Sequence, residues 1–509
     1  MDAIARPEPC VATSEPHRTP RPHDTPPPPN TPHPLNTPPP RSTSPVSVLH
    51  LPASAAAGEK PAPLPSKRPS RILRHARHTF LNVYRRLFGI VVGANVIGGI
   101  VLFRRPGGHD RAEFVGRLAT AAAANITLAL LARQDYIINA MFRLCWMVPR
   151  SAPLRLRRIV TKVYEYGGVH SGAAACSVAW FALCTSYITR EFCAGGPLRG
   201  PALVATSYGL LGLLGLLVVT ALPPFRGASH DAFENVHRWG GWAALVLFWA
   251  ELLLLARAQA PAVAPALARQ PAFYLLLLSS LHAILPWLRL RRLHVTPEQL
   301  SPHAVRLHFT APMPLFVGLR ISDAPLREWH AFACIPSRAG PAAGGSLLVS
   351  RAGDWTGRTV AAPRPSYWVK GVPVTGVLCM ARLFRRVVVV TTGSGIGPCL
   401  AVIQDIADSP LLGGTTGGGT RCRVLWSAPA PRRTYGPEIC DAVRAVDARA
   451  VIVDTRTEGR PDLVAMAWRL YRAEAAEAVF VISNPQLTRK VVYGLEARGV
   501  PTFGPIWDS

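Results

Sequence analysis

Apolar runs of membrane-spanning length dominate the middle of the chain. The first is LFGIVVGANVIGGIVLF, at 87–103, and five runs of similar length follow it. They lie at 114–132, 169–189, 203–222, 240–256 and 273–288. About 20 apolar residues let a helix cross a bilayer, so the pattern predicts six spans. The even number places both ends of the chain on one side of the membrane.

The pattern changes after residue 292. Short alternating runs such as VRLHF (305–309) and SLLVS (346–350) stand between proline and glycine turns, which is typical of a small antiparallel barrel. From Val387 onward, apolar strands alternate with glycine turns and helical stretches. The predicted fold is therefore an all-α six-helix membrane bundle, then an antiparallel β-barrel domain, then a doubly wound α/β domain.

These changes in pattern divide the chain into four segments. Residues 1–70 are rich in proline and cannot form a packed core, so they predict a disordered tail. The membrane bundle is expected at 71–292, the barrel at 293–385 and the α/β domain at 386–509.

The charge of the chain fits a membrane protein better than a nucleic-acid-binding one. The 56 Lys+Arg residues against 29 Asp+Glu give a net charge of +27, but no zinc-ligand spacing or RNA-binding aromatic motif accompanies them. Basic clusters lie at 67–86, 150–162 and 289–292, which predicts cytosolic N- and C-termini. Arg104, Arg105 and Arg111 argue against this orientation. The ten cysteines form no CxxC pair, so neither a structural disulfide nor a zinc site is expected.

A glycine turn follows the first strand of the α/β domain. Gly393, Gly395 and Gly397 come directly after the buried run Val387–Val390 and open the next helix. Without side chains at these positions, backbone N–H groups can approach a pyrophosphate. The other interpretation is an ordinary tight turn between a strand and a helix.

Three blocks in this half of the chain resemble the ferredoxin-reductase and ferric-reductase superfamily. TTGSGIGPCL, which contains Thr392 and Pro398, resembles its GxGIxP nicotinamide-binding turn. EWHAFACIP resembles its HPFT flavin-binding block and keeps His330 and Phe332, and RAGDWTGRT resembles its GxxT segment and keeps Thr356. The resemblance implies that the chain binds FAD and a nicotinamide nucleotide.

The membrane half shares this resemblance. NITLALLARQDYIIN (125–139) and FENVHRWGG (233–241) resemble the second and fifth spans of ferric reductases. The ending YGLEARGVPTFGPIWDS resembles that of fungal TmpA-type ferric-reductase-like flavoproteins. This likeness implies a multi-pass protein of the plasma membrane.

The chain departs from the family at two places. Ala331 and Ala333 replace the proline and the hydroxyl residue of the flavin block. Ser483 and Asn484 stand in an SNP sequence where the family has Cys-Gly-Pro, next to the nicotinamide. With Trp507, which can stack on the flavin or pack in the core, these two residues are the candidate catalytic positions.

The dinucleotide is expected to be NADPH. Ser427, Arg432 and Arg433 follow the second strand and could hold a 2′-phosphate through charge-assisted hydrogen bonds. The alternative is a solvated basic loop in a basic protein.

The histidines of the bundle fit at most one haem. His170 and His237 match the first ligand of each pair in ferric reductases, whereas Cys184 and Glu251 occupy second-layer positions. One inner haem b between the two histidines is one interpretation, and two interfacial histidines of a degenerate site are the other. Glu251 needs a partner within the apolar helix, and His282 is the candidate.

Two functions remain open from the sequence. The first is a membrane-bound, NAD(P)H-dependent flavin oxidoreductase of the ferric-reductase type, which passes electrons to an inner haem or an unknown acceptor. The second is a catalytically degenerate regulatory membrane protein of fungal development, for which the replaced motif residues and missing histidines argue.

Overall fold

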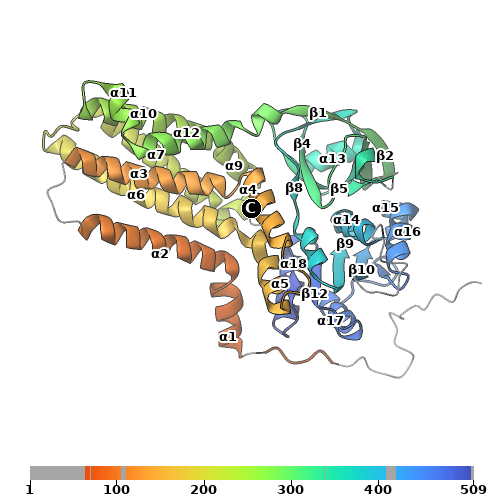
Figure 1. Ribbon diagram of the computed structural model, residues 1–509. Helices are drawn as coiled ribbons and strands as arrows, with labels where there is room; N and C mark the ends of the chain where they lie inside the picture. Colours follow the sequence, from red (N-terminus) through yellow and green to blue (C-terminus); the bar gives the residue numbers. More distant parts are fainter. Residues whose placement is uncertain (1–62, 69, 105–110, 338, 408–419, 506–509) are drawn as a thin grey trace, which may run out of the picture. The chain divides into compact units, whose positions relative to one another are not determined.

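The computed structural model describes residues 63–68, 70–104, 111–337, 339–407 and 420–505 (Figure 1). Nearly all of the predicted disordered tail lies outside these residues, as does Trp507.

Six helical segments are long and apolar enough to cross a membrane, which confirms the predicted number of apolar helices. They are α2 (Val83–Arg104), α3 (Arg111–Leu131), α6 (Gly167–Cys193), α7 (Pro201–Ala221), α9–η3–α10 (His230–Asn235, Val236–Gly240, Gly241–Gln259) and α12–η4 (Pro271–Ile284, Trp287–Arg289). Large apolar side chains are exposed along them, among them Ile90, Ile97 and Val246, each about two-thirds exposed. Such a surface suits contact with lipid.

The core of this bundle is packed with apolar and amide side chains. Helix α3 packs on α6 and α12, and α10 packs on α7 and α12 (Figure 1). Phe181 and Phe248 meet with ring centroids 5.2 Å apart. Asn95 and Asn125 exchange hydrogen bonds between α2 and α3.

Shorter helices lie before the first long helix and between the others. They are α1 (Arg71–His75), η1 (Ala76–Phe80), α4 (Asp135–Trp146), α5 (Leu154–Val160), η2 (Thr161–Glu165), α8 (Pro223–Ala228) and α11 (Val263–Ala268). Residues 135–165, which comprise α4, α5 and η2 and link α3 to α6, are called the connector below.

Eight antiparallel strands form the first sheet, in the order β1-β7-β4-β5-β6-β3-β2, with β8 paired to β4. They are β1 (Arg291–His294), β2 (Thr296–Ser301), β3 (Ala304–Phe309), β4 (Val317–Ser322), β5 (His330–Pro336), β6 (Gly345–Ser350), β7 (Ser366–Val369) and β8 (Val374–Thr375), with η5 (Pro341–Ala343), α13 (Asp354–Ala361) and η6 (Val377–Leu383) beside them. Only Val295 separates β1 from β2, although they lie at opposite ends of this order. The sheet therefore curls back on itself, as the predicted barrel requires.

The second sheet has five parallel strands in the order β11-β10-β9-β12-β13. Its elements are β9 (Arg386–Thr392), η7 (Gly393–Gly395), α14 (Ile396–Ala407), β10 (Arg421–Ala428), α15 (Pro431–Tyr435), α16 (Pro437–Val446), β11 (Val451–Asp454), α17 (Leu463–Ala473), β12 (Ala478–Ile482), α18 (Pro485–Glu496) and β13 (Thr502–Phe503). Val387 and Val389 lie in one hydrophobic core, whereas Val388 and Val390 lie in another. Burial on both faces explains the unbroken valine run and confirms the doubly wound class. The exact domain boundaries stay predictions.

The connector is bonded to both sheets. Near its start, Asp135 accepts a hydrogen bond from Arg320 of β4, and Asn139 bonds the backbone of Pro373 and Thr375. Phe142 is buried in the same core as Met380. One helical segment therefore positions the antiparallel sheet relative to the parallel one.

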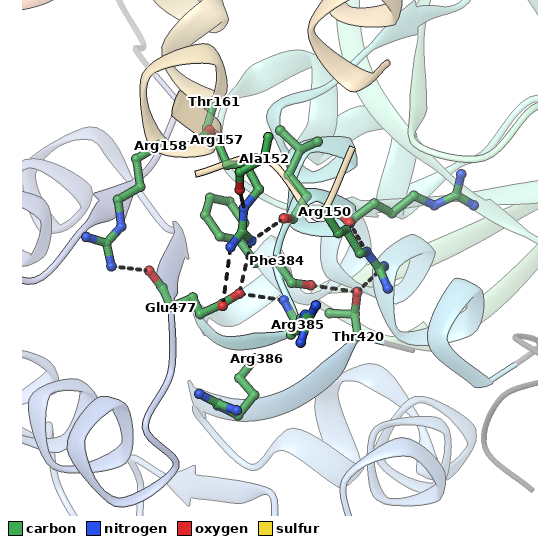
Figure 2. A network of polar contacts seen from close by, with 12 residues as sticks. Arg150, Ala152, Arg157, Arg158, Thr161, Phe384, Arg385, Arg386, Thr420 and Glu477 are labelled. Carbon is green, nitrogen blue, oxygen red and sulfur yellow. Dashed lines mark hydrogen bonds and ion pairs between the residues drawn. The ribbon is translucent and has the colours of Figure 1, made fainter. Parts of the chain in front are cut away.

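Arginines at the end of the connector hold the parallel sheet (Figure 2). Arg157 is 5% exposed, and its guanidinium donates to the carboxylate of Glu477 at 3.2 Å and to the carbonyl of Leu383 at 2.7 Å. Arg158 donates to the backbone carbonyl of Glu477, and Arg150 donates to Thr420. The basic cluster predicted to mark the cytosolic side thus has a specific structural role as well.

Candidate functional site

The glycine turn after β9 is shaped by close packing. A Cβ on Gly395 would lie 2.7 Å from the carbonyl oxygen of Ile482 in β12. Gly393 has a φ of +53°, and its carbonyl accepts a hydrogen bond from the indole of Trp426. Packing and backbone conformation therefore already require glycine at these two positions, whatever the turn binds.

The same turn abuts the antiparallel sheet. A Cβ on Gly397 would lie 3.4 Å from the Cβ of Leu348 in β6, and α14 packs on β5. The hydroxyl of Ser350, at the end of β6, donates to that of Ser394 at 2.7 Å. Pro398 follows in the first turn of α14. The predicted nicotinamide turn and the strand that carries the predicted flavin block are therefore neighbours.

The flavin block lies at the start of β5. The ring of His330 stacks on the indole of Trp355 with centroids 4.2 Å apart, and Phe332 stacks on the same indole at 5.9 Å. Burial lowers the pKa of His330, which favours the neutral imidazole. His330 Nε2 and Trp355 Nε1 are buried and have no hydrogen-bond partner in the described part of the chain. Two orphaned polar atoms beside the block fit a site that a polar cofactor completes.

Thr356 organises the start of helix α13. Its hydroxyl accepts hydrogen bonds from the backbone N–H groups of Ala352 and Gly353, each at 2.9 Å. A Cβ on Gly353 would meet nothing within 4 Å, so the approach to this helix end is open. An open helix N-terminus beside the orphaned atoms fits the diphosphate of a dinucleotide.

Ser483 and Asn484 have structural partners. The hydroxyl of Ser483 is hydrogen-bonded to that of Thr392, which joins the ends of β12 and β9. Asn484 caps α18, since its side-chain oxygen accepts from the N–H of Leu487 at 2.9 Å. Both residues lie at the carboxyl edge of the parallel sheet, next to the glycine turn. Their catalytic role stays a prediction, as does that of Trp507.

The residues predicted to hold a 2′-phosphate lie close together in sequence but differ in exposure. Ser427 is buried at the end of β10. Arg432 and Arg433 are exposed in α15, and Arg432 donates to the carboxylate of Asp441 at 3.3 Å. Arg433 is the exposed charge of this group for which no side-chain bond is found among the residues that the structure describes.

The two bundle histidines have the bonding of metal ligands. His170 Nδ1 lies 2.9 Å from the carbonyl oxygen of Ala129, and His237 Nδ1 lies 3.2 Å from that of Phe233. A carbonyl oxygen only accepts, so each ring has its proton on Nδ1 and a lone pair on Nε2. Metal-bound histidines usually have this arrangement. This bonding suits a haem ligand and an interfacial histidine alike, and a haem held by the two residues stays a prediction.

Sequence reasoning missed three parts of the site. The first is Trp355, which lies in the GDWTGRT block. An aromatic residue within a flavin motif could have indicated that it belongs to the site. The Ser350–Ser394 bond and the docking of the connector join segments far apart in sequence, and no local pattern indicates them.

The chain is similar to known proteins over most of its length. A family model described as the C-terminal domain of adenylate-forming reductase 03009 matches residues 377–509. Adenylate-forming reductases 03009 and 06235 of Coprinopsis cinerea are 42% and 41% identical over 453 and 455 residues, which are 87% and 88% of this chain. The chain spans only 42% of the length of either relative.

Solved structures are similar to part of the chain. A ferredoxin NADP+ reductase from Neisseria gonorrhoeae with bound FAD and NADP is 11% identical, with a TM-score of 0.34. The match covers 43% of this chain and 99% of that one. The fold assignment rests on the strand orders and pairings described above.

Proposed function

We propose that the protein is a membrane-bound flavin oxidoreductase that takes a hydride from NADPH and passes electrons to an acceptor at the cytosolic face of a membrane. We infer that the six apolar helices cross the plasma membrane with both termini in the cytosol. The basic clusters support this orientation.

One observation carries the proposal. The glycine turn of α14 lies against β5 and β6, and Ser350 and Ser394 join the two sheets by a hydrogen bond at 2.7 Å. Hydride transfer needs a nicotinamide and a flavin in contact, so the two nucleotide sites must adjoin as these segments do.

The residues of the site suit particular parts of the two cofactors. We assign the diphosphate of FAD to the open N-terminus of α13, near Gly353 and Thr356, and the flavin ring to the side of His330 and Phe332. NADPH would bind at the glycine turn, with Arg433 facing its 2′-phosphate. When bound, FAD supplies the change from a two-electron donor to single electrons.

The histidines suit an acceptor within the bundle. No partner of Nε2 is found for His170 or His237 among the described residues, which supports one haem b on the cytosolic side. The positions where ferric reductases carry their second pair of haem ligands lie near Cys184, Glu251 and the Phe181–Phe248 pair, none of which is a usual ligand of a bis-histidine haem. This supports an electron path that ends at His170 and His237.

An absorbance spectrum of the detergent-purified chain tests the proposal. We expect a flavin band that NADPH bleaches, and dye reduction that falls at least tenfold in Arg433→Ala when NADPH is limiting. Arg432→Ala is the matched control, because its side chain is already paired with Asp441. Protein without flavin and without dye reduction would contradict the oxidoreductase and favour the regulatory alternative.

The curated relatives favour a second candidate. Their names combine adenylate formation with reduction, which favours a carboxylic acid, activated as an adenylate, as the acceptor. NADPH consumption that depends on an acyl adenylate or thioester, and not on a dye, would distinguish this activity from the first.

A further inference from the structure

A buried carboxyl group in the bundle has no charged partner. Glu251 lies in α10 and is 3% exposed. Its Oε1 is 2.6 Å from the hydroxyl oxygen of Ser207 in α7, and Oε2 has no hydrogen-bond partner among the described residues. The partner suggested by the sequence was His282, and the structure shows Ser207 instead. An ionised carboxylate with one neutral contact is strongly disfavoured in an apolar interior.

The contacts of Ser207 indicate which form of the acid is present. Its hydroxyl oxygen lies 2.8 Å from the carbonyl oxygen of Leu203, as well as 2.6 Å from Glu251. A serine hydroxyl has one proton, and a carbonyl oxygen can only accept. If Ser207 donates to Leu203, the contact with Glu251 is completed by a proton on the carboxyl group. The acid form gives each short contact its own proton, whereas the carboxylate leaves one hydroxyl proton to be shared between two acceptors.

The surroundings of Glu251 select for a proton. A hollow beside it lies between α3, α10 and α12 and is lined by apolar side chains, namely Ala119, Ala123, Phe248, Leu252, Leu255, Ala272 and Leu276. This lining offers neither a cation to pair with the carboxylate nor further oxygen ligands for a metal ion. The smallest cation, covalently bound to the carboxyl group, is the ligand that such a site can hold.

Polar groups continue from this site along one face of α6. His170, Ser177, Cys184 and Glu191 follow one another at intervals of seven residues, which places them on one side of the helix. Ser177 is 1% exposed and its hydroxyl has no partner in the described segments, and Cys184 is buried in the same core as Leu252, the residue after Glu251 in α10. Glu191 is buried and paired at 3.0 Å with Arg111, whose side chain is 62% exposed. The column therefore reaches solvent at its Glu191 end.

We propose that Glu251 and Ser207 form a proton-binding site within the membrane bundle, which exchanges its proton with water at the Arg111–Glu191 end of α6. Uptake converts the carboxylate to a carboxylic acid, and release returns the proton along the same face. The proposal depends on the proposed function only in that the bundle crosses a membrane.

Infrared spectroscopy of the full chain in lipid nanodiscs tests it. A protonated carboxyl group has a carbonyl stretching band that carboxylates lack, and transfer to D2O moves this band if the proton exchanges. We expect the band at pH 7, its shift within minutes in D2O, and its loss in Glu251→Gln. Ser207→Ala should keep the band but move it to higher frequency, because one hydrogen bond is lost.

The controls separate the site from folding and from redox activity. Glu113→Gln alters an exposed acid on α3 that is paired with Arg117 and should leave the band unchanged. Circular dichroism checks that each variant keeps its helices. A band that persists in Glu251→Gln, or one that does not respond to D2O, would overturn the proposal. Absence of NADPH oxidation with an exchanging band would count against the proposed function alone.

Discussion

Acidic side chains with little exposure to solvent occur in two regions of the protein, and their partners differ between the two. Where the connector and the first helices meet the parallel sheet, Glu477 is bonded to Arg157 and to the N–H of Arg385, and Glu496 to His78 and Lys162. Within the bundle, Glu251 meets a single hydroxyl.

The contact region of the connector and the first helices with the parallel sheet is called the junction below. The pKa values of Glu477 and Glu496 at the junction follow from their partners. Burial alone would raise the pKa of Glu477 and Glu496, but their hydrogen bonds and positive neighbours outweigh burial and lower both values. The comparison teaches that this chain gives charged partners to the acids that join one part of the protein to another, and gives none to Glu251 in the middle of the bundle.

The largest expected effect concerns the arginine that holds the parallel sheet. Arg157→Ala leaves the partly buried Glu477 without its main partner, and breaking a pair of this kind typically costs about 3 kcal/mol. We expect a lower temperature of thermal unfolding in the full chain. Arg155→Ala is the matched control, since Arg155 is exposed two positions away. Equal melting of the two variants would show that the junction charges do not fix the sheet.

Acid should loosen the junction. A carboxyl group with a lowered pKa contributes stability above its ordinary value of 4.5, and this contribution disappears as pH falls through the folded-state value. We expect the melting temperature to fall below pH 4.5 and Glu496→Gln to flatten this dependence, by about 2 kcal/mol for a charged hydrogen bond.

Glu165 sharpens the same measurement. Burial raises its pKa, although Lys162 and the N–H of Tyr84 oppose this rise. The folded chain therefore binds this proton more readily than the unfolded chain does. Protonation of Glu165 stabilises the fold as pH falls, whereas protonation of Glu477 and Glu496 destabilises it. A Glu165→Gln variant should show a steeper loss of stability with acid than the parent, and a shallower loss would contradict the assignment.

A smaller effect is expected at a lysine held between two indoles. The ammonium of Lys370 lies 4.8 Å from the ring centre of Trp287 and 4.5 Å from that of Trp329, and burial, followed by the charge of Arg320, lowers its pKa to about 8. Raising pH through 8 should change tryptophan fluorescence in the parent but not in Lys370→Met. The cation–π contacts are worth about 1 kcal/mol.

The sign of the accompanying stability change is fixed by the direction of the shift. Between about 8 and the ordinary value of 10.5, the unfolded chain holds more protons at Lys370 than the folded chain does. Stability should therefore rise with pH in this window, and Lys370→Met should lack the rise. A fall in the parent would contradict the lowered pKa.

The smallest effect is expected at the hydroxyl bridge between the sheets. Ser350→Ala removes the hydrogen bond to Ser394, with a stability cost of about 1 kcal/mol. Under the proposed function, we expect a modest rise in KM for NADPH with flavin content unchanged. Ser350→Thr keeps the hydroxyl group and should behave like the parent; a defect as large as that of Ser350→Ala would argue against the bridge.

The sequence alone determined the kinds of element and their order. Runs of about 20 apolar residues, the valine run before the glycines and the period of the barrel strands are local patterns, and each is set by how a helix or a strand buries its own side chains. The two departures at Ala331 and Ser483 were also visible, because they are single positions within recognisable blocks.

Only the tertiary structure decided which partner each polar group has. The cluster at 150–162 predicted a membrane side, yet Arg157 and Arg158 are bonded to Glu477, more than 300 residues later. Gly395 was predicted to make room for a phosphate, yet the group that leaves no space for a side chain there is the carbonyl of Ile482. His282 was the predicted partner of Glu251, yet the structure shows a hydrogen bond with Ser207. Hydrogen bonds and ion pairs act over a few ångströms in space, and a sequence states residue types and spacing but not which distant segments come within that range.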